Sequence, residues 1–156
     1  MSRISIVLAG LLLGGFVILI VLRLLYAPHG RLYGNEGVAL AKLRSVVTLQ
    51  NEYARTRVTK GFACELHLLK PVEARDHAEY DPLRFLTTGT ESGYKYSLAN
   101  CRADAKGVFV QYQITAVPIE QGRTGFHAFC TDQSGVLWYD AEGSAANCLS
   151  SRHVFQ

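Results

Sequence analysis

The feature that most constrains this chain is an uninterrupted apolar run near its start, from Ile4 to Leu22, in which Ser5 is the only polar side chain. A helix made of this run is apolar on every face, whereas a helix on the surface of a globular domain carries a polar stripe. At about 1.5 Å per residue it nearly crosses the ~30 Å of hydrocarbon in a bilayer. The run therefore predicts a single-pass transmembrane helix, in contact with membrane lipid through residues 4–22, within an anchor of residues 1–27.

A cleaved signal peptide is the alternative interpretation of this run. Its apolar core is longer than the usual ~7–15 residues, and Leu25-Tyr26-Ala27 places a bulky leucine where the peptidase needs a small residue. We therefore expect the segment to stay attached. Pro28 and the glycines that follow it then predict a hinge or linker over residues 28–34.

The sequence after this linker predicts one α+β domain, residues 35–156. Apolar side chains recur at helical spacing over residues 38–54, which predicts an amphipathic helix from about Glu36 to Arg57. Asn35 is its expected N-cap, Glu36 complements the positive end of the helix dipole, and Gly61 supplies the stop. Two short helical turns, at 66–69 and 82–86, are expected on either side of a polar loop over residues 73–79.

Further along, the apolar residues change to a period of two. Alternation predicts half-buried strands over Tyr94–Leu98 and Val108–Thr115. Phe126–Thr131 and Val136–Tyr139 form a further pair, joined by a turn whose Gly135 can take the left-handed backbone of a short hairpin. The predicted fold is thus an N-terminal transmembrane helix, then an amphipathic helix packed on an antiparallel sheet of about four strands.

The cysteines indicate the compartment. Cys64, Cys101, Cys130 and Cys148 are even in number, widely spaced and free of any C-x-x-C pair, which is typical of two disulfides in an oxidising environment. Free buried thiols of a cytosolic domain remain the alternative. Cys148 follows the hairpin that Cys130 closes, so local loop closure favours Cys130–Cys148 and leaves Cys64–Cys101. Structural zinc usually needs two close ligand pairs, which are missing here, so we expect no metal and no cofactor.

Few side chains are candidates for chemistry, and we expect no enzyme. The candidates are His67, His77, His127, Asp132, Ser134 and His153. None of these residues belongs to a motif for nucleophilic, metal or phosphate chemistry. Asp132 and Ser134 are expected to form hydrogen bonds within the turn, and His127 to be a surface or edge residue. Trp138 and Tyr139 lie on opposite faces of one strand, so one of them should be in the core. With 16 Lys and Arg against 13 Asp and Glu, scattered along the chain, the +3 net charge does not predict nucleic-acid binding.

Three segments together resemble type IV pilin-like and pseudopilin-like proteins of the kind abundant in acidobacteria. They are the helix NEGVALAKLRSVVTLQNEYA (35–54), the strand TGTESGYKYSL (88–98) and GRTGFHAFCTDQSGVLWYDAEGSAANC (122–148). The resemblance implies a long N-terminal helix packed against an antiparallel sheet, and disulfides near the cysteines of this chain. It also implies a bacterial inner-membrane location, with the C-terminal domain in the periplasm or at the cell exterior.

The start of the chain departs from the family pattern. Pilins of this type carry a Gly before the apolar segment and an early Glu within it, whereas here Met1-Ser2-Arg3 precedes Ile4 and no carboxylate occurs before Glu36. A buried charge needs a compensating partner, so this chain lacks one contact through which pilin subunits assemble. We expect a pilin-like structural or interaction protein that does not polymerise by itself and that is associated with a pilus or a type II secretion pseudopilus. A tethered ligand-binding or sensing domain with the same fold is the alternative.

Overall fold

The structure, a computed structural model, describes residues 3–71 and 81–155, without the side chains of residues 3–13 and 23–29. The predicted polar loop of residues 73–79 therefore lies outside the described residues. In chain order the elements are α1 (Arg3–Thr56), η1 (Leu66–Leu69), α2 (Phe85–Thr88), β1 (Thr90–Glu91), β2 (Tyr94–Ala103), β3 (Phe109–Pro118), β4 (Ala128–Asp132), β5 (Trp138–Asp140), α3 (Ala145–Ser151) and β6 (His153–Val154).

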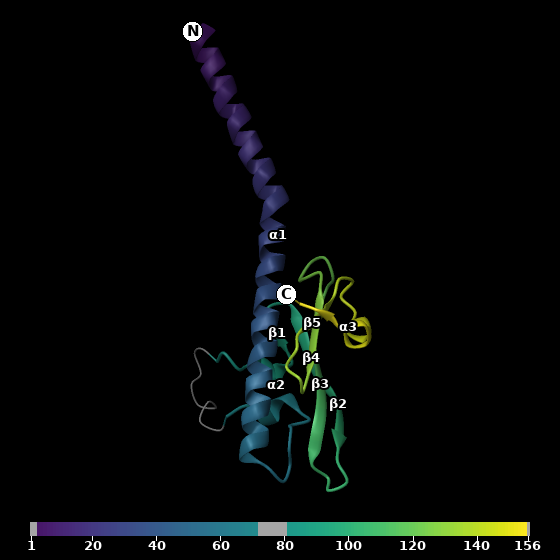
Figure 1. Ribbon diagram of the computed structural model, residues 1–156. Coiled ribbons are helices and arrows are strands. Elements are labelled where there is room, and N and C mark those ends of the chain that lie inside the picture. Colours follow the sequence, from purple (N-terminus) through teal and green to yellow (C-terminus); the bar gives the residue numbers. More distant parts are fainter. Residues whose placement is uncertain (1–2, 72–80, 156) are drawn as a thin grey trace.

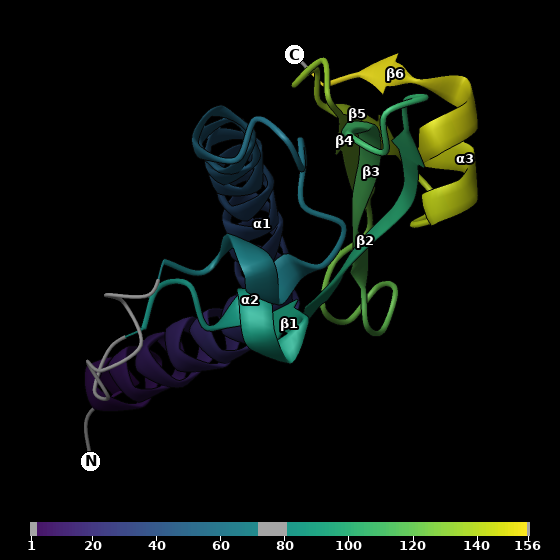
Figure 2. The same cartoon turned by 90° about the horizontal axis from the view of Figure 1, so that it is seen from below.

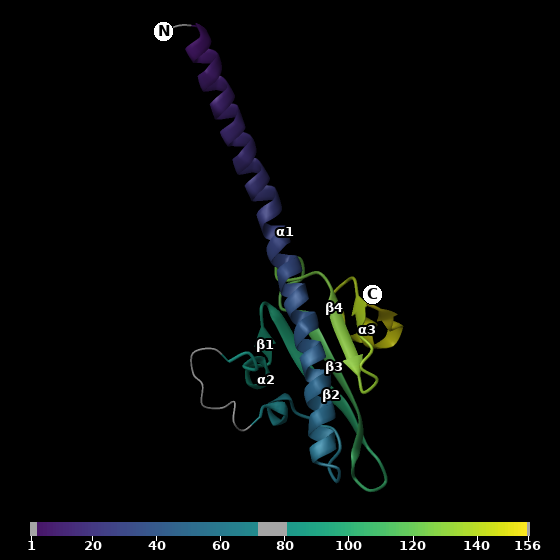
Figure 3. The same cartoon turned by 60° about the vertical axis from the view of Figure 1, so that its left-hand side comes forward.

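α1 is a single helix that continues without interruption through the predicted hinge. Figures 1 and 3 show its first half projecting beyond the sheet, and Figure 2 shows that the two halves lean in different directions. The prediction of a loop over residues 28–34, with a new helix capped by Asn35, is wrong. Pro28 has no backbone N–H, and a helical glycine costs up to about 1 kcal/mol, but such penalties bend or weaken a helix without necessarily ending it.

The prediction of a transmembrane helix is also wrong. In the described part of the chain, no helix combines the length and the apolar character needed to cross a membrane. The exposed apolar stretch whose side chains are described, residues 14–22, rises about 14 Å, roughly half of the ~30 Å of hydrocarbon in a bilayer. The side chains of residues 4–13, the rest of the predicted segment, lie outside the description.

The second half of α1 is amphipathic, as its periodicity predicts. The apolar residues of its buried face follow each other at steps of one, three and seven positions, and they are Leu32, Ala39, Leu40, Leu43, Val46 and Tyr53. From Ala39 onward they pack on a layer of aromatic and aliphatic side chains from the sheet, among them Tyr94, Tyr112 and Phe129. This contact forms the main hydrophobic core.

The sheet is antiparallel throughout, and within the described residues it has six strands in the order β1-β2-β3-β4-β5-β6. The predicted strands are present as β2 and β3, and the predicted hairpin as β4 and β5. The count of about four strands is too low because β1 and β6 have two residues each, too few to show any alternation.

The sheet is covered on both faces. α1 contacts β3 and β4 on one face, whereas α3 contacts β4 and β5 on the other. Figure 2, seen along the second half of α1, shows these two helices on opposite sides of the strands. η1 and α2 lie together beside α1 and correspond to the two predicted helical turns.

Candidate functional site

The projecting half of α1 is the most prominent surface feature of the molecule. The large apolar side chains that the structure describes in it are exposed by 43 to 64%, and they are Phe16, Val17, Ile18, Leu19, Ile20, Val21 and Leu22. Consecutive residues of a helix point to all sides, so this segment, the projecting segment hereafter, is apolar around its whole circumference. Fully burying one such side chain contributes about 1.5–3 kcal/mol, so the segment favours a large contact with another apolar surface.

A buried carboxylate fixes the helix where it leaves the sheet. Glu36 lies on the buried face of α1 and is only 7% exposed. Its Oε1 accepts hydrogen bonds from the backbone N–H groups of Phe126, at 2.8 Å, and His127, at 3.1 Å. The Nδ1 of His127 lies 3.1 Å from the same oxygen. Glu36 thus ties α1 to the segment that enters β4, rather than serving as the dipole partner at a helix start.

Neighbouring contacts complete this connection, which we call the Glu36 junction (Asn35, Glu36 and residues 124–127). The Nδ2 of Asn35 donates to the carbonyl oxygen of Thr124 at 2.9 Å. Tyr94 Oη donates to the carbonyl oxygen of His127 at 2.9 Å, and Gly125 packs so closely that a Cβ there would overlap this hydroxyl. Burial raises the pKa of Tyr94 well above its usual value, and the nearby Glu36 raises it further.

Two residues in these connections were missed by sequence reasoning. Glu36 is four residues before Leu40 and four after Leu32, so its helical phase alone could have placed it on the apolar face. Gln50 is fully buried, donates from Nε2 to the carbonyl oxygen of Ala63 and accepts the Ala63 N–H, both at 2.8 Å. It holds the chain that follows α1 against the helix.

The two turn residues behave as predicted. Asp132 Oδ1 accepts the Ser134 N–H at 2.8 Å, and Gly135, at a φ of +73°, donates to the carbonyl oxygen of Asp132 at 3.0 Å. Asp132 Oδ2 also lies 3.6 Å from Arg152 Nη2. Both side chains serve the hairpin.

Two of the candidate histidines lie beside the same aromatic ring. His127 and His153 flank the ring of Tyr139, with centroid separations of 5.7 and 6.3 Å. His67 lies on η1, 3.2 Å from Glu65, and His77 lies outside the described residues. Tyr139 is half-buried among these rings, whereas Trp138 is buried on the opposite face, with the Arg152 guanidinium 4.8 Å from its ring centre.

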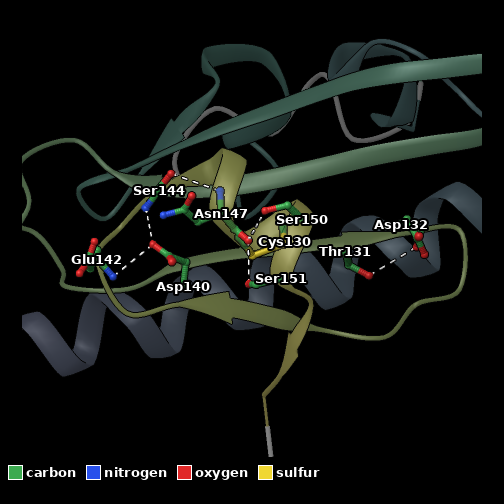
Figure 4. Close-up of a disulfide and its surroundings, with 10 residues drawn as sticks. Cys130, Thr131, Asp132, Asp140, Glu142, Ser144, Asn147, Ser150 and Ser151 are labelled. Carbon is green, nitrogen blue, oxygen red and sulfur yellow. Dashed lines mark hydrogen bonds between the residues drawn. A yellow bond between two sulfur atoms is a disulfide. The ribbon is translucent and has the colours of Figure 1, made fainter.

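Both disulfides pair as the sequence predicts, Cys64 with Cys101 and Cys130 with Cys148. Cys130–Cys148 is fully buried and joins β4 to α3. Figure 4 shows how the helix is held beside this bond: the Ser144 side chain caps α3 by accepting the Asn147 N–H at 3.3 Å, and Asp140 Oδ2 accepts the N–H of Ser144 at 2.7 Å.

Two shallow, open depressions meet at the turn between β1 and β2, with Ser92 and Gly93 in both linings. Each lining contains both acidic and basic side chains, Glu91 and Arg84 in one and Glu120 and Arg123 in the other. Because the charges are mixed, the depressions select no ligand class.

In the ranges that the structure describes, no group of three or more His, Cys, Asp or Glu side chains is arranged to hold a metal ion. The arrangement instead presents an apolar helix from a rigid base, the Glu36 junction. Comparison of the chain with protein-family models, with curated proteins and with solved structures finds no match.

Proposed function

We propose that this chain is an extracytoplasmic, pilin-like structural or interaction protein without enzymatic activity, which joins a type IV pilus or a type II secretion pseudopilus. The observation that carries the proposal is the projecting segment, an exposed apolar helix continuous with a helix packed on an antiparallel sheet. The two disulfides support a location outside the cytoplasm, where thiols are oxidised.

In this proposal the projecting segment packs among the helices of neighbouring subunits. The uninterrupted α1 favours such packing, because one rigid helix can hold the sheet domain at a fixed position relative to its neighbours. The Glu36 junction supports the same role, since its buried hydrogen bonds prevent the helix from swivelling on the sheet.

The partners in the proposed assembly are other subunits rather than further copies of this chain. In the pilins that this chain resembles, an early Glu pairs with the amino terminus of a neighbouring subunit inside the apolar layer. Glu36 is the first carboxylate of this chain, so the projecting segment has no acidic side chain for such a pair. We propose a minor component inserted among subunits that supply this charge themselves.

Site-specific photo-crosslinking tests the proposal. The full chain is produced in cells that express a pilus or pseudopilus machine, with a photoreactive amino acid in place of Leu19 in the projecting segment. The control places it at Thr48, which is exposed on the half of α1 that packs on the sheet. We expect Leu19 to cross-link to the helices of pilus or pseudopilus subunits and Thr48 to give none of these products.

Equal cross-linking from both positions, or none from Leu19, would contradict the proposal. The alternative, a ligand-binding or sensing domain, would gain support if the chain also failed to co-purify with the machine.

A further inference from the structure

A second exposed surface lies at the end of α1 opposite the projecting segment, where the hairpin between β2 and β3 also ends (Figures 1 and 3). Backbone hydrogen bonds join the two: Phe109 donates to the carbonyl oxygen of Lys60 at 3.0 Å, and Phe62 donates to that of Phe109 at 2.9 Å. We call this surface the distal tip, and its exposed charged and large apolar residues are Arg57, Val58, Lys60, Arg102, Asp104, Lys106, Phe109 and Val110.

The distal tip is strongly basic. Arg57, Lys60, Arg102 and Lys106 make no ion pair with any side chain that the structure describes. Asp104 is the acidic residue of the hairpin turn, and its Oδ1 is occupied by the N–H groups of Lys106 and Val108 at 2.8 and 3.0 Å. Four cations less one carboxylate give the tip a charge of +3, which equals the net charge of the whole chain, 16 − 13 = +3.

Apolar side chains lie among these cations. Val58, just after α1, is 74% exposed, and Phe109 and Val110, at the start of β3, are 36% and 42% exposed. The surface is also held in shape, because the Cys64–Cys101 disulfide and the Gln50 hydrogen bonds to Ala63 fix the adjoining chain. Such pre-organisation lowers the entropy lost on binding a shaped partner.

We propose that the distal tip binds an acidic segment of a partner protein, one that carries carboxylates for the four cations and an apolar side chain for Val58 and Phe109. The proposal does not rest on the function of the projecting segment, which lies at the other end of the molecule. Single-stranded nucleic acid is a poorer fit because it favours several stacking aromatics, and the tip offers Phe109 alone. An anionic bilayer is a poorer fit because interfacial anchoring needs a broad apolar face, and the tip offers three large apolar side chains, Val58, Phe109 and Val110, among four cations.

The test measures binding of the full chain to a fluorescent peptide of four Glu-Glu-Leu repeats. Anionic phosphatidylglycerol vesicles and a single-stranded oligonucleotide are the competing probes. The variant K60E/K106E reverses two charges in the distal tip, and R44E/K95E reverses two exposed cations outside it, so both variants carry the same net charge. We expect the first to weaken peptide binding about tenfold or more and the second to change it less than about twofold.

A third variant, Val58→Ser, tests the apolar contribution at a side chain too exposed to affect folding. It should weaken binding of the Glu-Glu-Leu peptide and leave a Glu-Glu-Ser peptide unaffected. The proposal is overturned if the peptide does not bind, if the two charge variants lose affinity equally, or if the vesicles or the oligonucleotide bind more tightly than the peptide.

Discussion

At the scale of single residues, two tyrosines of β2 each place a hydroxyl group in the interior, but only one of these hydroxyls has a hydrogen-bond partner among the described residues. Tyr94 Oη donates to the carbonyl oxygen of His127 at 2.9 Å. Tyr96 Oη is buried and has no hydrogen-bond partner among the described residues. Both rings lie in the core beneath α1. A buried hydroxyl stabilises the fold only where a partner replaces the water that it has lost.

This contrast predicts opposite effects for one chemical change. Tyr94→Phe should lower the free energy of unfolding by about 1 kcal/mol, because a hydrogen bond and its carbonyl partner are lost. Tyr96→Phe should raise it by about 1 kcal/mol, because an unpaired buried hydroxyl is removed. Urea denaturation of the two variants beside the parent protein measures both values. A loss of stability in Tyr96→Phe equal to that in Tyr94→Phe would show that its hydroxyl is paired.

Glu36 shows why part of the site could not be predicted at this scale. An acidic residue just after a plausible N-cap looks like a helix-dipole partner, and the local sequence contains nothing that contradicts this interpretation. Its hydrogen-bond partners, Phe126 and His127, are 90 and 91 residues away. Only the path of the chain in space brings them together.

At the scale of elements, the junction between the end of α1 and the start of β3 depends on Gly61. Its φ is +73°, and a Cβ at this position would overlap the carbonyl oxygen of Phe109, the atom that accepts the hydrogen bond from Phe62. Gly61 is therefore required twice, for its backbone conformation and for the close approach of the two segments.

A second glycine separates these two requirements. Gly107, in the turn between β2 and β3, has a φ of +79° but open space around it. Gly107→Ala should lower the free energy of unfolding by about 1–2 kcal/mol, the cost of a left-handed backbone. Gly61→Ala should lower it by about 3 kcal/mol or more, since steric overlap is added. Thermal unfolding of the two variants gives the comparison, and equal losses would mean that β3 can move away from Gly61 freely.

Elements were predictable where their signals are local. The hairpin of β4 and β5 follows from its turn residues, because Asp132 and Gly135 determine the backbone of the turn without help from the rest of the chain. The length of α1 was not predictable in this way. The signals at Pro28 and the nearby glycines do favour a break, but the helical turns on either side continue through them.

At the scale of the whole molecule, three buried tyrosines make stability depend on alkaline pH. Burial raises the pKa of Tyr112 to about 12, and the nearby Asp132 adds to the shift. Burial also raises the pKa of Tyr94 and of Tyr96, with further contributions from Glu36 and Glu91 respectively. All three hydroxyls hold their protons more tightly in the folded protein than in the unfolded chain.

The sign of the effect follows from this difference. Below pH 10, the ordinary tyrosine value, both states are protonated and the stabilisation is complete. Between pH 10 and 12 the unfolded chain loses these protons first, so the free energy of unfolding should fall, by on the order of 2–3 kcal/mol for Tyr112 alone.

Ultraviolet absorbance of tyrosinate, followed together with circular dichroism, tests this dependence. The buried Tyr94, Tyr96 and Tyr112 should titrate only as the protein unfolds. Complete titration of all tyrosines while the circular dichroism signal is unchanged would contradict the prediction.

The disulfides also determine how the molecule would respond to tension. A chain pulled from its two ends lengthens by up to about 3.4 Å for each residue that is released. Cys64–Cys101 and Cys130–Cys148 enclose separations of 37 and 18 residues, which removes about 120 and 60 Å of possible extension. The Cys64–Cys101 disulfide would still hold β2 after its hydrogen bonds break. The Cys130–Cys148 disulfide would hold β4 and α3 together in the same way. Under tension, extension would therefore come from the residues outside the two disulfide loops.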